Sequence, residues 1–228
     1  MVEACSCGST DFGGDMRERA SAASAPARWQ RWGGGGLIAA AVLQGAGLAG
    51  YYFTATRMPS VAFAIADGFP LLAATAILLA AFPLALGSNG TNGIVGASVT
   101  GRVALVAFGG FTVLAPLTRL GFFFVSFPES GGIQATAELF QALAVITGLI
   151  GAVVIARAGI AVGAARYALL ATGLIAVIAV LAGSLNNFLG WVLAAASVLA
   201  QLATGILYLR NRQRLGLVAR GNPKNLAE

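Results

Sequence analysis

Three charged residues lie in or beside long apolar stretches, where an unpaired charge is costly and usually serves a function. They are Asp67, Arg119 and Glu138. Glu138 shares a predicted helical face with Gln134, four residues before it, and Gln141, three residues after it. A carboxylate between two amides can bind a cation or exchange a proton, and Arg119 can pair with the other carboxylate. These five residues form a hypothetical outward-facing site for a small solute or ion.

The segment around Asp67 allows two structures. In the first, a helix begins upstream at Val61 and is interrupted near Gly68, because Pro70 has no N–H to donate to the carbonyl of Ala66. A broken helix of this kind leaves free carbonyls beside a carboxylate, as in transporters that bind Na⁺ or H⁺. In the second, the helix starts at Gly68 and Asp67 is simply its N-cap.

The other two charges also have a structural interpretation. Glu138 is then expected at the N-terminus of a helix, where the helix dipole favours an anion. Arg119 is expected at a C-terminus, where the dipole favours a cation. In this interpretation the charges stabilise helix ends and form no pocket.

The composition excludes most cofactor and metal chemistry. The chain contains no histidine, the commonest ligand of haem, zinc and copper. Its two cysteines, Cys5 and Cys7, lie in a polar N-terminal segment and offer too few ligands for a structural zinc site. The net charge of +6 comes from basic residues beside apolar stretches, where they orient helices and meet lipid headgroups. We therefore expect no cofactor, no metal and no nucleic-acid partner.

Six apolar stretches must position these residues. Each is close to the length of about 20 residues that a helix needs to cross about 30 Å of hydrocarbon. The predicted spans cover residues 37–56, 68–86, 102–124, 133–156, 166–185 and 188–209. Only 10% of the residues are charged, too few for the polar surface of a soluble domain. The sequence predicts an all-α integral membrane protein, a six-transmembrane-helix bundle in the lipid bilayer.

The distribution of positive charge predicts the orientation of the bundle. Only Arg57 and Arg119 fall on one side of the predicted spans. The other twelve basic residues fall on the opposite side: Arg17, Arg19, Arg28, Arg31, Arg102, Arg157, Arg166, Arg210, Arg212, Arg214, Arg220 and Lys224. Because basic residues concentrate in cytoplasmic segments, both termini are predicted to be cytoplasmic. Residues 1–36 then form a flexible polar tail, 37–209 the transmembrane domain and 210–228 a basic tail.

Small and neutral polar residues predict how the helices associate. Small residues recur at packing distance along several spans, as at Gly45, Gly148 and Ala200, and allow close backbone approach in lipid. The same faces can also bind a second copy of the chain or a partner membrane subunit. Gln44 and Gln201 lie deeper in their spans and are predicted to form interhelical hydrogen bonds.

Three functions are compatible with these patterns. The leading one is transport of a small solute or ion through the polar site formed by Asp67, Arg119, Glu138, Gln134 and Gln141. The alternative is a non-catalytic membrane subunit or scaffold of a larger assembly, which needs packing faces but no pocket. The third is a membrane-embedded acid–base enzyme acting on a lipid or isoprenoid. Enzymatic activity is not favoured, and the Arg-rich, Ala/Gly-rich composition indicates a bacterial plasma membrane.

Overall fold

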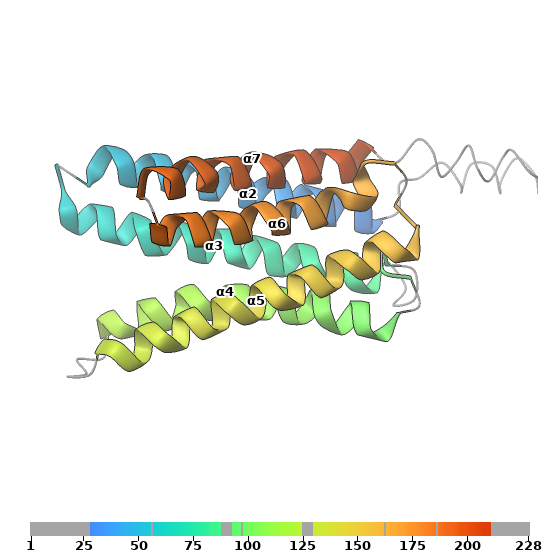
Figure 1. The fold of residues 1–228 in the computed structure, drawn as a ribbon, viewed down its shortest axis with the longest axis horizontal. Coiled ribbons are helices and arrows are strands. Elements are labelled where there is room, and N and C mark those ends of the chain that lie inside the picture. Colours follow the sequence, from blue (N-terminus) through green and yellow to red (C-terminus); the bar gives the residue numbers. More distant parts are fainter. Residues whose placement is uncertain are drawn as a thin grey trace, which may run out of the picture.

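The computed structural model describes residues 28–55, 57–87, 93–96, 98–124, 130–161, 163–185 and 187–210, and this part of the chain forms six long helices (Figure 1). In chain order they are α2 (Arg28–Thr54), α3 (Pro59–Leu86), α4 (Val99–Phe124), α5 (Ser130–Ala158), α6 (Ala165–Leu185) and α7 (Asn187–Arg210). Each is long and apolar enough to cross a membrane. The predicted all-helical architecture with six candidate spans is thus confirmed. The outer parts of both predicted tails, with Cys5 and Cys7, lie outside the described residues.

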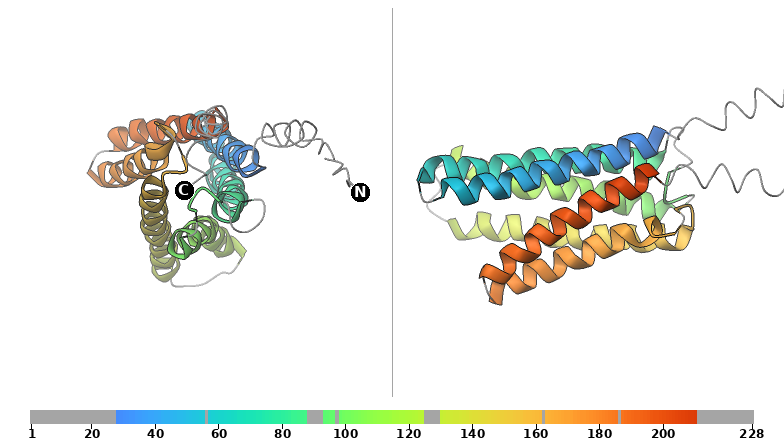
Figure 2. Two further views of the ribbon diagram at one scale, coloured as in Figure 1. Left: turned by 90° about the vertical axis from the view of Figure 1, so that its right-hand side faces the viewer. Right: turned by 90° about the horizontal axis from the view of Figure 1, so that it is seen from above.

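The six helices pack side by side in a closed ring. Each packs mainly on its neighbours in the sequence, and α2 packs on α7 to complete the circle. The end-on view in Figure 2 shows the helices arranged around a central space. The contact between α5 and α6 is the least extensive of the six neighbouring contacts. Because no helix runs through the centre, side chains and cavities must occupy it.

The two ends of the bundle differ in charge. We call the end where α2 begins and α7 ends the inner end, after the predicted cytoplasmic side, and the opposite end the outer end (Figure 1). The alternating helix directions bring six described arginines to the inner end: Arg28, Arg31, Arg102, Arg157, Arg166 and Arg210. Arg57 and Arg119 belong to the outer end. The placement of the inner end in the cytoplasm stays a prediction.

Helix α2 begins at Arg28, nine residues before the predicted start of the first span. The added segment, residues 28–36, includes four consecutive glycines, which have a low intrinsic helix propensity. Two of them allow α2 to approach α3 closely. A Cβ atom on Gly36 would lie 2.7 Å from the Cβ atom of Ala80, and one on Gly33 would collide with Leu84. Tertiary packing therefore stabilises a helix that propensity alone disfavours.

The predictions that placed the three charges at helix ends are wrong. Helix α3 begins at Pro59 and continues through Pro70, so Asp67 is neither an N-cap nor next to an unwound stretch. Glu138 lies two turns inside α5, and Arg119 lies more than a turn before the end of α4. Pro59 accounts for the early start of α3, because a proline at the first helical position loses no hydrogen bond.

Candidate functional site

Two connected cavities lie inside the ring. The inner cavity has a volume of about 380 Å³ and is lined by residues from all six helices. The outer cavity has a volume of about 250 Å³ and is lined by α2, α3, α4 and α5. Gln44, Thr112 and Gln141 line both cavities, so the two meet at these side chains. The bundle therefore contains a site that contacts every described helix.

The lining of the inner cavity is mostly apolar, with neutral polar groups among the aliphatic and aromatic side chains. The polar members are Gln44, Thr112, Gln141, Thr172, Ser197 and Gln201. No residue that lines this cavity in the described part of the chain carries a charge. Small-molecule sites commonly combine apolar walls with a few polar groups that orient the ligand.

Two hydroxyl groups that line the cavity donate hydrogen bonds to backbone carbonyls of their own helices. Thr112 Oγ1 donates to the carbonyl of Phe108 at 2.6 Å, and Ser197 Oγ donates to the carbonyl of Ala194 at 2.8 Å. Each oxygen keeps lone pairs that can accept from a ligand. Within the described part of the chain, the amides of Gln44 and Gln141 form no hydrogen bond. Both amides can therefore donate to and accept from a ligand at the junction of the cavities.

Asp67 and Arg119, predicted to form a site together, are close in the structure. Asp67 lies on α3 and is half-buried, and Arg119 lies on α4. The positive charge of Arg119 acts electrostatically on the carboxylate of Asp67. Arg119 also lines the outer cavity, together with Gln141 from α5. Two of the five predicted site residues, Arg119 and Gln141, therefore line the outer cavity, and Asp67 interacts with Arg119 without lining it.

Glu138 and Gln134 form a pair of their own. The Nε2 atom of Gln134 donates to Oε1 of Glu138 at 2.9 Å, and both side chains are exposed. Neither residue lines the two cavities. They share the helical face of Gln141 but lie closer to the outer end of α5. This separates the Glu138 pair from the residues that line the cavities.

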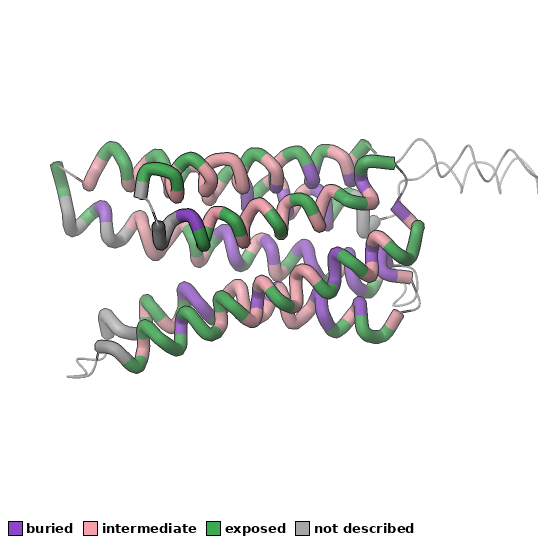
Figure 3. Tube along the Cα trace, in the orientation of Figure 1, coloured by how far each residue is buried: buried purple, intermediate pink, exposed green. Residues whose placement is uncertain are grey.

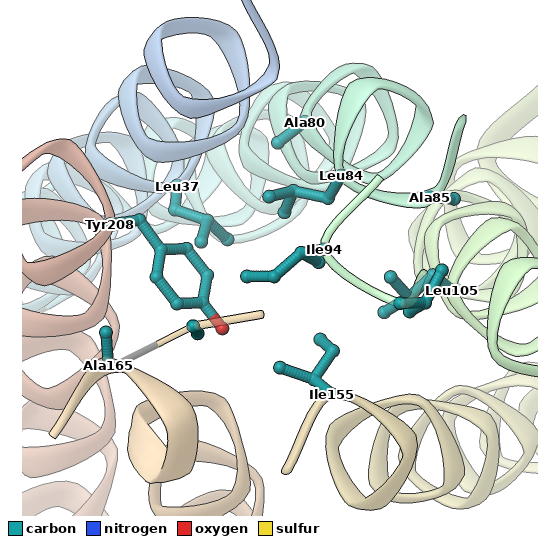
Figure 4. Close-up of a cluster of buried hydrophobic side chains, with 11 residues drawn as sticks. Leu37, Ala80, Leu84, Ala85, Ile94, Leu105, Ile155, Ala165 and Tyr208 are labelled. Atoms are coloured by element: carbon teal, nitrogen blue, oxygen red, sulfur yellow. The ribbon is translucent and has the colours of Figure 1, made fainter. Parts of the chain in front are cut away.

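A cluster of buried apolar side chains closes the inner end of the ring. We call it the inner plug, and its residues are Leu37, Ala80, Leu84, Ala85, Ile94, Val95, Leu105, Ile155, Ala161, Ala165 and Tyr208. Each of the six helices contributes, and on each helix the plug residues lie inward of the cavity lining. Figure 4 shows Ile94 near the centre, with Leu37, Leu84, Ile155 and Tyr208 around it. Figure 3 shows that most buried positions lie toward this end.

The connection between α3 and α4 supplies the centre of the plug. Ile94 and Val95 are almost completely buried although they lie in a turn. The amide of Ile94 donates to the carbonyl of Leu84 at 2.9 Å, and Nη2 of Arg102 donates to the carbonyl of Gly96 at 3.0 Å. These hydrogen bonds hold the turn beneath the inner cavity.

The plug also contains a polar atom without a partner. The side chain of Tyr208 is completely buried, and its hydroxyl forms no hydrogen bond with the described residues. A buried unsatisfied hydroxyl costs about 1–3 kcal/mol. The closed plug is therefore less stable than a fully satisfied apolar cluster of the same size.

Several lining residues were not predicted as site residues. Gln44 was expected to form an interhelical hydrogen bond and instead lines both cavities. The expectation for Gln201 is confirmed, since its Nε2 donates to the carbonyl of Leu37 on α2 at 3.4 Å, but it also lines the inner cavity. Thr112 and Ser197 gave no signal, because hydroxyl residues are common in membrane helices and bond to their own backbone.

No protein-family model matches the chain, and neither a curated protein nor a solved structure matches it. The case for a function therefore depends on the cavities, the plug and the side chains around them.

Proposed function

We propose that this multi-pass membrane protein transports a small solute across the bilayer through its central cavity. In this proposal the solute enters from the outer end, binds at the junction of the two cavities and leaves when the inner plug opens. One observation carries the proposal: a cavity bounded by all six helices has polar groups in its wall and a plug at one end. This arrangement is expected of a transporter that faces outward.

The cavity favours transport over the scaffold function. A subunit that only positions partners gains stability from close packing at its centre, because filling space adds van der Waals contacts. Here about 380 Å³ at the centre is not filled by side chains. The residues around it include Gln44 and Gln141, whose amides form no hydrogen bond within the described part of the chain. A solute or water that occupies the cavity satisfies these groups.

Two features support a plug that can open. Helices α5 and α6 make the least extensive contact in the ring, so they can separate at lower cost than other neighbours. The unsatisfied hydroxyl of Tyr208 makes the closed state less stable and favours a rearrangement in which this group finds a partner. Transporters commonly alternate access by moving one group of helices against another around a central site.

The test measures from which side of the membrane the cavity can be reached. Ser197 lines the inner cavity, and Ser197→Cys is nearly isosteric. With Cys5 and Cys7 replaced by serine, a membrane-impermeant charged thiol reagent is applied to intact cells and to inverted membrane vesicles. We expect labelling in both preparations, because a transporter exposes its cavity alternately to each side.

Ala203→Cys is the matched control on the same helix, since Ala203 is exposed on the surface of α7 and lines neither cavity. It should stay unlabelled in both preparations, because lipid excludes a charged reagent. Labelling of Ser197→Cys from one side alone indicates a fixed cavity and rejects transport. No labelling from either side rejects the water-accessible cavity itself.

A further inference from the structure

We infer that the solute is an amphipathic monoanion, a molecule with one anionic group and an apolar body. The inference rests on the proposed function because it assigns the solute site to the central cavity. The anionic group is expected in the outer cavity at Arg119, and the apolar body in the inner cavity. The argument for each half of the molecule comes from different residues.

Arg119 provides the site for the anion. Among the described residues that line the two cavities it is the only one with a charge. Its guanidinium has five donors, and within the described part of the chain no hydrogen bond uses them. Asp67 acts on Arg119 electrostatically but lines neither cavity. A carboxylate in the outer cavity can therefore approach the guanidinium and form two parallel hydrogen bonds.

The inner cavity provides the site for the apolar body. Its wall is uncharged and includes Ile77, Phe108, Val145, Leu149 and Leu169. Its volume of about 380 Å³ lies within the range of about 300–1,000 Å³ that small-molecule pockets have. A strongly hydrated ion would have to give up water here without a counter-charge, which is costly in an apolar environment. An apolar group gains free energy from the same transfer.

The junction of the cavities fixes the orientation of the molecule. Gln44, Thr112 and Gln141 come from three helices and line both cavities. They lie between the charged outer wall and the apolar inner wall, where the polar end of an amphipathic molecule meets its apolar body. The amide donors of Gln44 and Gln141 can supplement the hydrogen bonds from Arg119 to the carboxylate. The order of charge, amide and apolar wall along the cavity matches the order of groups in the proposed ligand.

The test compares three probes that share one apolar body. They are 4-phenylbutanoate, its uncharged amide and the corresponding cationic amine, 4-phenylbutylamine. Binding to the full-length protein in lipid nanodiscs is measured by isothermal titration calorimetry, and empty nanodiscs correct for partition into lipid. We expect the carboxylate to bind about tenfold more tightly than the amide, because charge-assisted hydrogen bonds are about twice as strong as neutral ones. The amine should bind most weakly.

Two variants, each with a matched control, separate the two halves of the site. Arg119→Gln should remove most of the preference for carboxylate over amide, whereas Arg57→Gln, an exposed arginine at the same end outside both cavities, should keep it. Ala176→Phe introduces a ring into the wall of the inner cavity and should abolish binding of all probes. Ala171→Phe, on the exposed surface of the same helix, should not.

Equal affinities for carboxylate and amide, or a preference that survives Arg119→Gln, overturn the monoanion. Absence of carboxylate binding above the empty nanodiscs overturns it as well. These outcomes differ from failure of the proposed function, since the labelling of Ser197→Cys needs no ligand. Selective binding with a cavity reached from one side only keeps the ligand class and rejects transport. Labelling from both sides without a preference for the carboxylate keeps transport and rejects the ligand class.

Discussion

Arg119 and Asp67 are two charged residues that lie within candidate membrane spans and interact electrostatically. Both lie inside helices that are candidate spans, where charges are costly unless they are paired or face water. Arg119 is exposed and lines the outer cavity, and its positive charge acts electrostatically on the half-buried carboxylate of Asp67. Glu138 is exposed, as Arg119 is, and it is hydrogen-bonded to Gln134 on the same helix. The two carboxylates therefore differ in what their removal should change.

This difference gives a prediction for stability. Asp67→Asn removes the half-buried carboxylate on which the charge of Arg119 acts and should lower the free energy of unfolding by about 1 kcal/mol. Glu138→Gln removes a charge from an exposed site and should change it by less than about 0.5 kcal/mol. Reversible unfolding in mixed micelles measures both values. A larger loss for Glu138→Gln than for Asp67→Asn contradicts the placement of the charge pair.

Part of the site could be predicted from single residues. Charges in apolar stretches identified Asp67 and Arg119, and the helical face of Glu138 identified Gln141, although Glu138 itself lines neither cavity. Thr112, Thr172 and Ser197 could not be identified, because nothing in the sequence says which hydroxyl faces the centre of a ring. That property depends on how each helix is rotated against its neighbours, and packing decides the rotation.

At the scale of the helices, glycine determines how closely the ring can close. Gly34 on α2 and Gly205 on α7 lie at the contact that joins the first described helix to the last. A Cβ atom on Gly205 would lie 2.7 Å from Cγ1 of Ile38 and 2.8 Å from the carbonyl oxygen of Gly34. Close backbone approach of this kind is a main source of helix association in lipid.

We therefore predict that Gly205→Ala separates α7 from α2 and lowers the free energy of unfolding by about 1–3 kcal/mol, the usual cost of overpacking. Gly110 on α4 is the matched control, since a Cβ atom there would have no neighbour within 4 Å. Gly110→Ala should stabilise the protein by about 0.5–1 kcal/mol through higher helix propensity. Reversible unfolding in mixed micelles measures whether each substitution lowers or raises the free energy of unfolding. Equal effects of the two substitutions contradict a close α2–α7 contact.

The six helices themselves followed from length and hydropathy, because only long apolar helices or closed barrels can cross a bilayer. The residues at which α2 and α3 begin could not be predicted from length and hydropathy. Four glycines suggested a tail and Pro70 suggested a break, yet both segments are helical. In each case the local preference of a residue is overridden by packing in the bundle, which a single sequence does not display.

At the scale of the whole molecule, the ring is asymmetric from one end to the other. The inner end has six described arginines, the buried turn at Ile94 and the apolar plug. Toward the outer end lie the outer cavity and the Arg119–Asp67 pair. The charge pattern predicted this polarity, but the plug was not predicted, because Ile94 and Val95 lie in a short connection that reads as an ordinary loop. Their burial shows that the connection folds back into the ring.

The most direct test asks whether the inner plug is the barrier that closes a path through the ring. Ile94 is truncated in the variants Ile94→Val and Ile94→Ala, which lose about 0.5–1.5 and about 2–5 kcal/mol of stability respectively. Circular dichroism and size-exclusion chromatography confirm that each variant is folded. Leu79→Ala is the control, since Leu79 is 66% exposed on the outer surface of α3. Each protein is reconstituted into liposomes, and light scattering follows the entry of urea and glycerol.

If the cavity is part of a path across the membrane, vesicles with wild type or Leu79→Ala should exclude both solutes as well as empty vesicles do. Ile94→Val should then leak slowly and Ile94→Ala faster, because each lost methyl group widens the barrier beneath the inner cavity. Folded Ile94→Ala protein that admits neither solute would contradict a path closed by the plug.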